Sequence, residues 1–139
     1  MDDGKHLVEE AIKAREFAYA PYSRFAVGAA LLTQSGKIYT GCNIESASYS
    51  PTNCAERTAF FKAVSEGERE FLRIAIVGGE QGQPIYELCP PCGVCRQVMM
   101  EFCDPKTFRI ILASGPKEFR DFTLEELLPQ GFGPGNLHK

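Results

Sequence analysis

The 139-residue sequence lacks three features, and each absence excludes a class of protein. It has no apolar run approaching the ~20 residues that a membrane-spanning helix needs. It has no excess of basic charge, because its formal net charge is −3, which argues against a protein that neutralises nucleic-acid phosphates. Internal repeats, low-complexity tracts and linker-like stretches are also missing. We therefore expect one globular domain over residues 1–139, with neither a membrane nor a nucleic acid as its partner.

The first residues of the chain are too charged for a secretory signal, so we expect a cytoplasmic protein. Thiols stay reduced in that compartment. The six cysteines are therefore expected to be metal ligands, nucleophiles or small buried side chains rather than disulfide partners.

The hydrophobic pattern alternates between helical and strand periods along the chain. Strands separated by single helices favour parallel pairing, whereas an early hairpin adds an antiparallel part. The pattern therefore predicts an α/β fold with three layers, α/β/α, around a mixed central sheet. The expected helices cover residues 5–19, 54–65, 93–102 and 123–128, and the expected strands cover 25–33, 38–42, 71–77 and 107–113.

Three cysteines are placed for a zinc site. Cys54 opens one expected helix, and Cys92 and Cys95 form a C-x-x-C pair that opens another. A helix N-terminus favours the thiolate over the thiol. Three protein ligands leave the fourth tetrahedral position of Zn²⁺ open to water, which is the arrangement of a catalytic site.

Cys89 offers an alternative, because Cys89 and Cys92 form a second, overlapping C-x-x-C pair. As a fourth ligand, Cys89 would turn the site into a structural one. The stiff Pro90–Pro91 link opposes that approach and has no N–H groups to donate to a sulfur. Cys42 and Cys103 are interpreted as small buried hydrophobic residues.

Glu56 and Arg57 follow Cys54 directly, and each has two readings. Glu56 is a proton shuttle beside the metal or the third residue of a capping box that begins at Asn53. Three thiolates and Zn²⁺ sum to a charge of −1, so a cation that donates to a ligand sulfur would restore the acidity of the metal. Arg57 suits that role, since a cation is otherwise unfavourable at a helix N-terminus.

The sequence resembles the cytidine deaminases, specifically the small homotetrameric zinc enzymes, nearly from end to end. The matching segments are 20–25 (APYSRF), 27–30 (VGAA), 41–45 (GCNIE), 54–59 (CAERTA) and 91–98 (PCGVCRQV). The wider zinc deaminases combine a first His or Cys ligand, a Glu that does not bind the metal, and a later P-C-x-x-C. Here the first ligand is a cysteine.

The resemblance implies a cytidine deaminase-like fold and a role for each matching residue. Cys54, Cys92 and Cys95 would hold one zinc per chain, and Glu56 would shuttle protons. Arg57 keeps the supporting role argued above from the charge of the site. The nucleoside would be held by residues that pack on the pyrimidine, bind the ribose or read the base; these are Phe25 for packing, Asn43 and Glu45 for the ribose, and the backbone of Ala55 for the base. Tyr49 and Phe132 would reach an adjacent subunit's site in a homotetramer, although the sequence of residues 128–132 differs from the one usual in the family.

The implied reaction is the hydrolytic deamination of cytidine or 2′-deoxycytidine to uridine or 2′-deoxyuridine, with release of ammonia, in pyrimidine salvage. Zinc-activated water would attack C4, and Glu56 would carry the protons. One alternative is a related small-molecule deaminase such as a blasticidin S deaminase. A second is a non-catalytic interaction module stabilised by zinc, which would need Cys89 as a fourth ligand.

Overall fold

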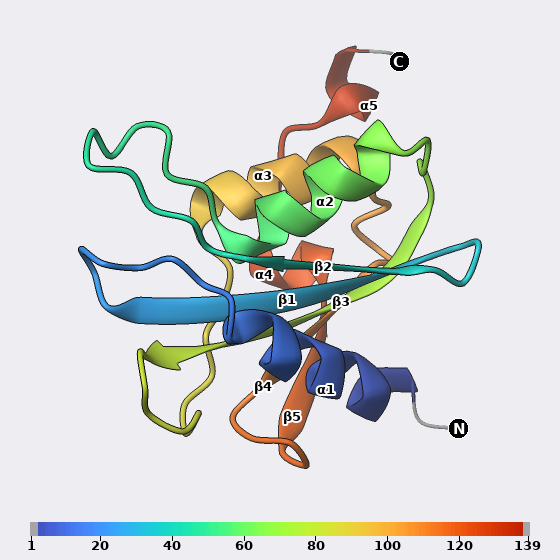
Figure 1. Cartoon of the computed structure of the whole chain (residues 1–139). Coiled ribbons are helices and arrows are strands. Elements are labelled where there is room, and N and C mark those ends of the chain that lie inside the picture. The colour runs from blue at the N-terminus through green and yellow to red at the C-terminus, as the bar shows by residue number, and fades with distance from the viewer. Residues whose placement is uncertain (1–2, 138–139) are drawn as a thin grey trace.

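Five strands form a single sheet in the order β2-β1-β3-β4-β5 in the computed structural model, which describes residues 3–137 (Figure 1). The strands are β1 (Phe25–Thr33), β2 (Ile38–Cys42), β3 (Phe71–Glu80), β4 (Arg109–Ala113) and β5 (Phe119–Thr123). The helices are α1 (Asp3–Arg15), α2 (Ala55–Ser65), α3 (Gly93–Phe102), α4 (Leu124–Leu127) and α5 (Pro134–Leu137). Across the described range, no helix has both the length and the apolar character needed to cross a membrane.

The sheet is mixed, and helices cover both of its faces, which confirms the predicted three-layer α/β/α architecture. β3 and β4 run parallel because α3 carries the chain back between them, whereas the other neighbouring strands run antiparallel. α1 lies against one face, and α2 and α3 lie against the other (Figure 1). Side chains alternate accordingly: Ile74 and Ile76 join the core beneath α2 and α3, while Val77 joins the core beneath α1.

Two glycines let helices approach the sheet at backbone distance. A Cβ atom on Gly28 would lie 2.1 Å from the carbonyl oxygen of Ala11 in α1. A Cβ atom on Gly41 would lie 2.4 Å from the carbonyl oxygen of Ala55, the first residue of α2. Gly41 therefore determines how closely the N-terminus of α2, where Cys54 and Glu56 lie, can seat on β2.

The structure corrects several predicted boundaries. α1 ends at Arg15 rather than at residue 19, because Tyr19 leaves the helix to form a bridge with Ile44. β3 continues beyond residue 77 to Glu80, because β1 pairs with its last residues. The predicted helix at 123–128 is reduced to α4, for which Thr123 is the N-cap. Strand β5 and the short α5 were not predicted.

Candidate active site

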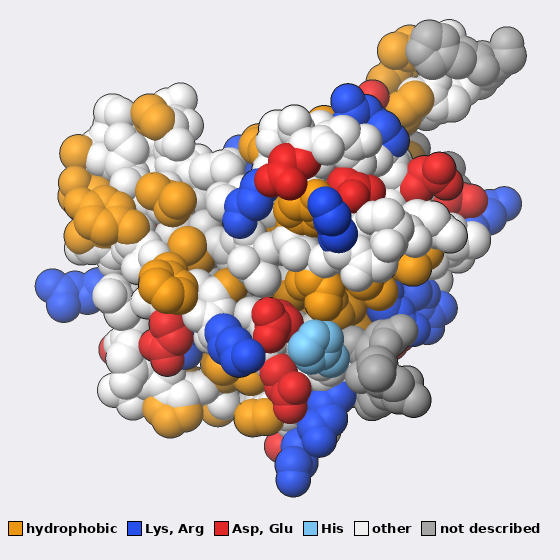
Figure 2. All heavy atoms as spheres, turned by 45° about the vertical axis from the view of Figure 1, so that its right-hand side comes forward, with side chains coloured by type: hydrophobic (Ala, Val, Ile, Leu, Met, Phe, Trp, Pro, Cys, Tyr) orange, Lys and Arg blue, Asp and Glu red, His pale blue; other side chains and the backbone are white. Residues whose placement is uncertain are grey.

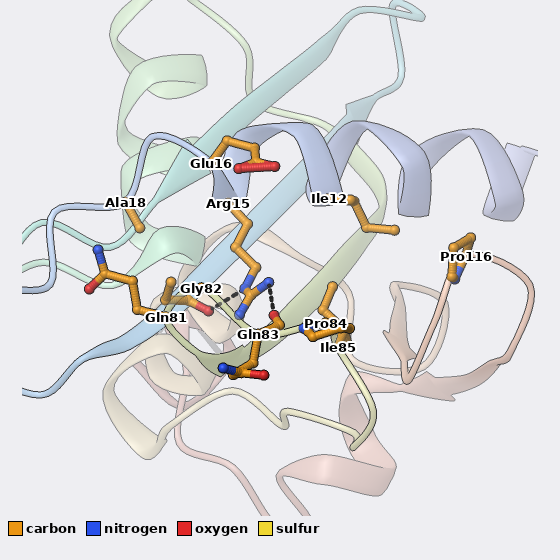
Figure 3. A pocket seen from close by; sticks show the side chains of 11 residues that line it. Ile12, Arg15, Glu16, Ala18, Gln81, Gly82, Gln83, Pro84, Ile85 and Pro116 are labelled. Carbon is orange, nitrogen blue, oxygen red and sulfur yellow. Dashed lines mark hydrogen bonds between the residues drawn. The ribbon is translucent and has the colours of Figure 1, made fainter.

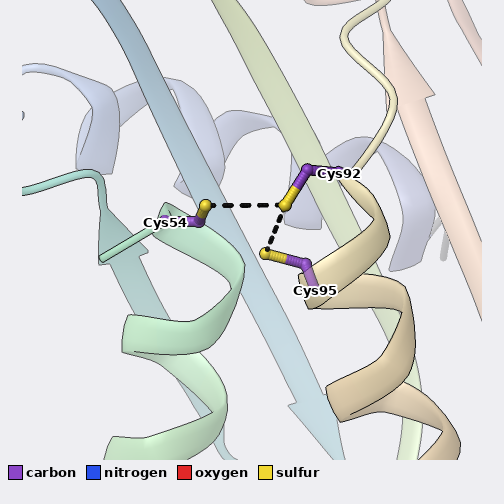
Figure 4. A group of neighbouring side chains, drawn as sticks. All are labelled: Cys54, Cys92 and Cys95. Atoms are coloured by element: carbon purple, nitrogen blue, oxygen red, sulfur yellow. Dashed lines mark hydrogen bonds between the residues drawn. The ribbon is translucent and has the colours of Figure 1, made fainter. Parts of the chain in front are cut away.

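Two helix N-termini bring three cysteines together on one side of the sheet. Cys54 is the N-cap of α2 and Cys92 is the N-cap of α3, while Cys95 lies in the first turn of α3. Figure 4 shows the three thiols pointing toward one another from these two helices. Both N-caps have extended backbone angles, and neither accepts a capping hydrogen bond through its side chain. The sulfur atoms are therefore turned toward a shared point rather than toward the helix backbone.

The spacing of the three sulfur atoms fits a tetrahedral zinc ion. The Sγ atoms of Cys54 and Cys92 are 3.8 Å apart, and those of Cys92 and Cys95 are 3.6 Å apart. All three sulfurs lie within 4.8 Å of one another, and they form the only such ligand group found among the described residues. With Zn–S bonds of about 2.3 Å, a tetrahedral site separates its sulfurs by about 3.8 Å. The thiols thus fit one zinc per chain.

The electrostatics of the cluster also favour a cation. Hydrogen bonding with Cys95 lowers the pKa of the Cys54 thiol to about 5; burial opposes this shift, and the Arg57 guanidinium adds to it. The same hydrogen bond raises the pKa of Cys95. Ionisation of one thiol therefore disfavours ionisation of the next one. All three thiols can be ionised together only when a cation lies between them.

Glu56 lies in the first turn of α2 with only 5% of its surface exposed. Burial raises the pKa of its carboxyl group to about 7; hydrogen bonds from its own backbone N–H and from the Cys95 thiol act in the opposite direction, and the Cys54 charge adds to the rise. The capping alternative does not hold, because Cys54 is the N-cap and the Asn53 amide donates instead to the Thr58 hydroxyl. The carboxyl group is left next to the cluster with a pKa suited to proton transfer near neutral pH.

Arg57 contacts the cluster directly. Its Nη2 donates to the Sγ of Cys54 at 3.3 Å. Its Nε is buried and, within residues 3–137, has no hydrogen-bond partner. The guanidinium therefore places positive charge against the thiolate, as the sequence argument required, and withdraws electron density from the sulfur.

Cys89 lies outside the group of three sulfurs. A Cβ atom on Gly78 would lie 2.7 Å from the Cys89 sulfur, so this thiol packs against the β3 backbone. Burial raises its pKa to about 11, which keeps it neutral. Burial likewise raises the pKa values of Cys42 and Cys103, in agreement with inert side chains.

Phe25 and Asn43 meet at the start of β1. Phe25 is the first residue of the strand, and 44% of its surface is exposed. The Asn43 amide spans this strand end: its Oδ1 accepts from the N–H of Val27 at 2.9 Å, and its Nδ2 donates to the carbonyl of Phe25 at 2.8 Å. One N–H and one lone pair of the amide remain for another partner. With these two hydrogen bonds Asn43 holds the backbone around Phe25 in place, independently of any ligand that Asn43 binds.

Glu45 and Tyr49 line an open cavity of about 380 Å³ together with Tyr22, Ser23 and Thr52. The Glu45 carboxylate accepts hydrogen bonds from the N–H groups of Tyr22 and Ser23 and from the Ser23 hydroxyl. The hydrogen bond from the Ser23 hydroxyl contributes most to holding the pKa of the Glu45 carboxyl group below its usual range, and the bonds from the two N–H groups add to this effect. Tyr49 is 72% exposed, has a φ of 62°, and its ring meets the Tyr22 ring edge-on.

Ala55 is the first residue of α2 and is fully buried. Its backbone N–H belongs to the first turn, where N–H groups have no acceptor within the helix. This N–H is therefore suited to donate to a bound molecule at the helix N-terminus.

A second cavity, of about 630 Å³, lies between the end of α1 and residues 81–85 (Figure 3). The Arg15 guanidinium points into it and donates to the backbone carbonyls of Ala26, Glu80 and Gln83. The cation is thus used to join α1 to the sheet and to the loop after β3. Sequence reasoning missed this anchor, because its acceptors are backbone atoms from distant segments.

The comparisons with known proteins agree with this geometry. Residues 1–111 match the family model described as the cytidine and deoxycytidylate deaminase zinc-binding region. The chain is 52% identical to a cytidine deaminase of Halalkalibacterium halodurans over 94% of each chain. It is 50% identical to a cytidine deaminase of Sporosarcina psychrophila over 97% of this chain and 95% of that one.

Solved structures give the same result. A cytidine deaminase from Burkholderia pseudomallei superposes with a TM-score of 0.82 and 48% identity, covering 91% of this chain and 97% of the other. One from Mycobacterium tuberculosis superposes with a TM-score of 0.79 and 39% identity, covering 94% of this chain and 98% of the other. The chain therefore belongs to the cytidine deaminase family of zinc-dependent hydrolytic deaminases.

Proposed function

We propose that this protein hydrolyses cytidine and 2′-deoxycytidine to uridine and 2′-deoxyuridine, with release of ammonia, as a step in pyrimidine salvage. The observation that carries the proposal is the buried Glu56 carboxyl group beside three thiols that fit zinc. Zinc held by Cys54, Cys92 and Cys95 would act as a Lewis acid that lowers the pKa of the attacking water. The kinship with cytidine deaminases supports the choice of a nucleoside substrate.

Glu56 serves as the proton carrier of this reaction. Its carboxylate accepts a proton from the attacking water and delivers it to N3 of the pyrimidine while the C4–O bond forms. The proton of the new C4 hydroxyl then passes through the same group to the exocyclic amino nitrogen, and the C4–N bond breaks to release ammonia as the C4 carbonyl of uridine forms. A carboxyl group that both accepts and donates needs a pKa near the working pH, and the burial of Glu56 supplies that.

The proposal is tested by measuring ammonia release from the purified protein with cytidine, 2′-deoxycytidine, cytosine and blasticidin S. We expect turnover of the two nucleosides and none of free cytosine, because the sugar is needed to hold the base. Turnover of blasticidin S alone would identify a different deaminase. Absence of turnover from a zinc-replete protein would favour a non-catalytic module.

We assign the ribose to Glu45 and Asn43, and the pyrimidine to Phe25 and the Ala55 backbone. The three hydrogen bonds to Glu45 keep its carboxylate ionised and oriented along the 380 Å³ cavity, with a lone pair left for a sugar hydroxyl. Asn43 retains one donor and one acceptor after bracing β1. These remaining hydrogen-bonding sites support a contact with the 3′-hydroxyl.

Replacing Glu45 by Gln is expected to weaken nucleoside use, because an amide accepts more weakly than a carboxylate. The cost is roughly 0.5–3 kcal/mol, or about 2- to 150-fold in kcat/KM. The amide can still accept from Tyr22 and Ser23, so the loop should stay in place. 3′-Deoxycytidine is the control, because it already lacks the contact. An equal loss of kcat/KM for both substrates would contradict the assignment.

We further propose that the enzyme is a homotetramer in which Tyr49 and Phe132 reach a neighbouring subunit's site. Both rings are more than half exposed in the single chain, as is that of Tyr19. Figure 2 shows apolar side chains on the lobe at the left of the view with mostly uncharged neighbours, while those at the centre of the view lie among charged side chains. Contiguous exposed apolar side chains are typical of surfaces that a partner covers. Light scattering should give about four times the 15.4 kDa chain mass, and an active monomer would refute the proposal.

Residues 1–139 are proposed to form one catalytic domain that works in the cytoplasm. The Halalkalibacterium halodurans relative is matched over 94% of its own length, which supports a single domain. Six free cysteines in the structure, three of them in the ligand cluster, suit a reducing compartment.

A further inference from the structure

Arg96 joins the loop before α3 to the C-terminal part of the chain. Its Nε donates to the carbonyl oxygen of Pro91 at 2.8 Å, and its Nη1 donates to the carbonyl oxygen of Leu127 at 2.7 Å. Both contacts are partly buried. A guanidinium is a planar fork with several donors, so one side chain holds two backbone segments in a fixed relation.

The first contact lies directly beside a zinc ligand. Pro91 precedes Cys92, the N-cap of α3, and the Pro91 carbonyl belongs to the peptide unit that leads into Cys92. Pro90 and Pro91 have no N–H groups, so this stretch has fewer donors with which to anchor itself. Arg96 supplies a hydrogen bond from outside the loop. A cation in the first turn of a helix is unfavourable, so the position of Arg96 in the first turn of α3 needs a compensating contact of this kind.

The second contact is to an element that is itself firmly seated. α4 begins with a complete capping box, in which Thr123 and Glu126 satisfy each other's backbone N–H groups. Leu124 is fully buried in the core beneath α2 and α3, and Leu127 packs against that core. The Leu127 carbonyl therefore offers Arg96 an acceptor with a defined position.

We propose that Arg96 is a positioning residue that couples the placement of Cys92 to the seating of α4. Through this guanidinium, the C-terminal part of the chain helps to hold the metal ligands at tetrahedral spacing. The inference rests on the proposed zinc role of Cys92. The two are distinguishable, because a wild-type protein without zinc would refute the zinc role, whereas unchanged zinc release in an Arg96 variant would refute only the coupling.

The test compares Arg96→Lys with Arg69→Lys in the zinc-loaded, full-length protein. Lysine keeps the positive charge but lacks the planar set of N–H donors with which the guanidinium reaches both carbonyls. Arg69 is a matched control, because it also donates to two backbone carbonyls, those of Val64 and Glu68, but at the opposite end of α2 from Cys54. Zinc release to the chelator 4-(2-pyridylazo)resorcinol is the readout.

We expect Arg96→Lys to bind zinc about 10- to 100-fold more weakly than wild type, the range typical when a partner of a metal ligand is lost, and hence to release it faster. Arg69→Lys should release zinc at the wild-type rate. Cobalt-substituted protein gives a second readout, since the thiolate-to-cobalt absorption bands should shift only in Arg96→Lys. Wild-type release and spectrum in Arg96→Lys would overturn the inference.

Two further variants test the path through α4. Thr123→Ala removes the capping box, so it should speed zinc release in the wild-type background but add little in Arg96→Lys. Gln97 also holds the C-terminal segment, by donating to the Phe132 carbonyl, but makes no bond to Pro91. Gln97→Ala should therefore release zinc at the wild-type rate. Equal acceleration of zinc release by Gln97→Ala and Thr123→Ala would refute the coupling, and this comparison holds even if Arg96→Lys folds poorly. Additive effects of Thr123→Ala and Arg96→Lys on zinc release would also refute it.

Discussion

Replacing Glu56 by Gln is expected to abolish deamination while the protein keeps its zinc and its fold. An amide has the shape of the carboxyl group but neither accepts a proton from water nor returns one to N3. General acid–base groups contribute about 10²–10⁴-fold to a rate, and Glu56 serves more than one transfer, so kcat should fall by at least that range. Stability should change little, because burial already disfavours the charged form of Glu56.

The measurements are kcat, zinc content by elemental analysis and the melting temperature, each compared with wild type. Glu66→Gln is the control on the same helix, since Glu66 is the C-cap of α2 and accepts from the Tyr39 hydroxyl far from the thiols. That variant should turn over cytidine at the wild-type rate. Near-normal kcat in a zinc-replete Glu56→Gln protein would show that another group carries the protons.

Single replacements of Cys54, Cys92 and Cys95 by Ala should each remove both zinc and activity. Two thiols and water hold zinc far more weakly than three thiols at tetrahedral spacing, and metal binding contributes to the free energy of folding. We expect much less than one zinc per chain and a lower melting temperature in each variant. Activity should be undetectable without the metal.

Cys89→Ala is the matched control, because it removes a thiol from the same loop. Its sulfur packs against Gly78 rather than into the cluster, so the variant should retain one zinc per chain and normal turnover. A modest loss of stability is expected from the small space that the thiol leaves. Zinc depletion in Cys89→Ala would place this cysteine among the ligands and favour a structural site.

Local spacing in the sequence identified the candidate thiols and the candidate acid, although it left open a ligand role for Cys89 and a capping role for Glu56. Cys54, Cys92 and Cys95 could be grouped because they lie at the starts of two helices whose N-termini could be predicted, and α3 runs over the predicted residues. What the sequence could not reveal are the partners that fix these groups from a distance. The bonds from Tyr22 and Ser23 to Glu45 depend on loops that meet only in the fold.

Tertiary pairing also explains the boundaries that the sequence misplaced. The helical pattern of residues 5–19 continues past Arg15, but the N–H of Tyr19 bonds to the Asn43 carbonyl, which draws the chain out of the helix. Gly78 and Gly79 indicated a strand end, yet they pair with β1. Gly78 is needed there because the Cys89 sulfur occupies the space of a side chain.

The close seating of α1 and α2 on the sheet gives Gly28 and Gly41 a tolerance to mutation opposite to that of Gly115 and Gly135. At Gly28 and Gly41 any side chain would collide with helix backbone, which cannot move without displacing the helix. At Gly115 and Gly135 a side chain would enter open space. If the four codons were randomised and active clones selected, glycine alone should survive at the first two positions, and many amino acids at the others. Random mutagenesis of this enzyme thus has little freedom where the helices rest on the sheet, and much more where the backbone of a glycine faces open space, as at Gly115 and Gly135.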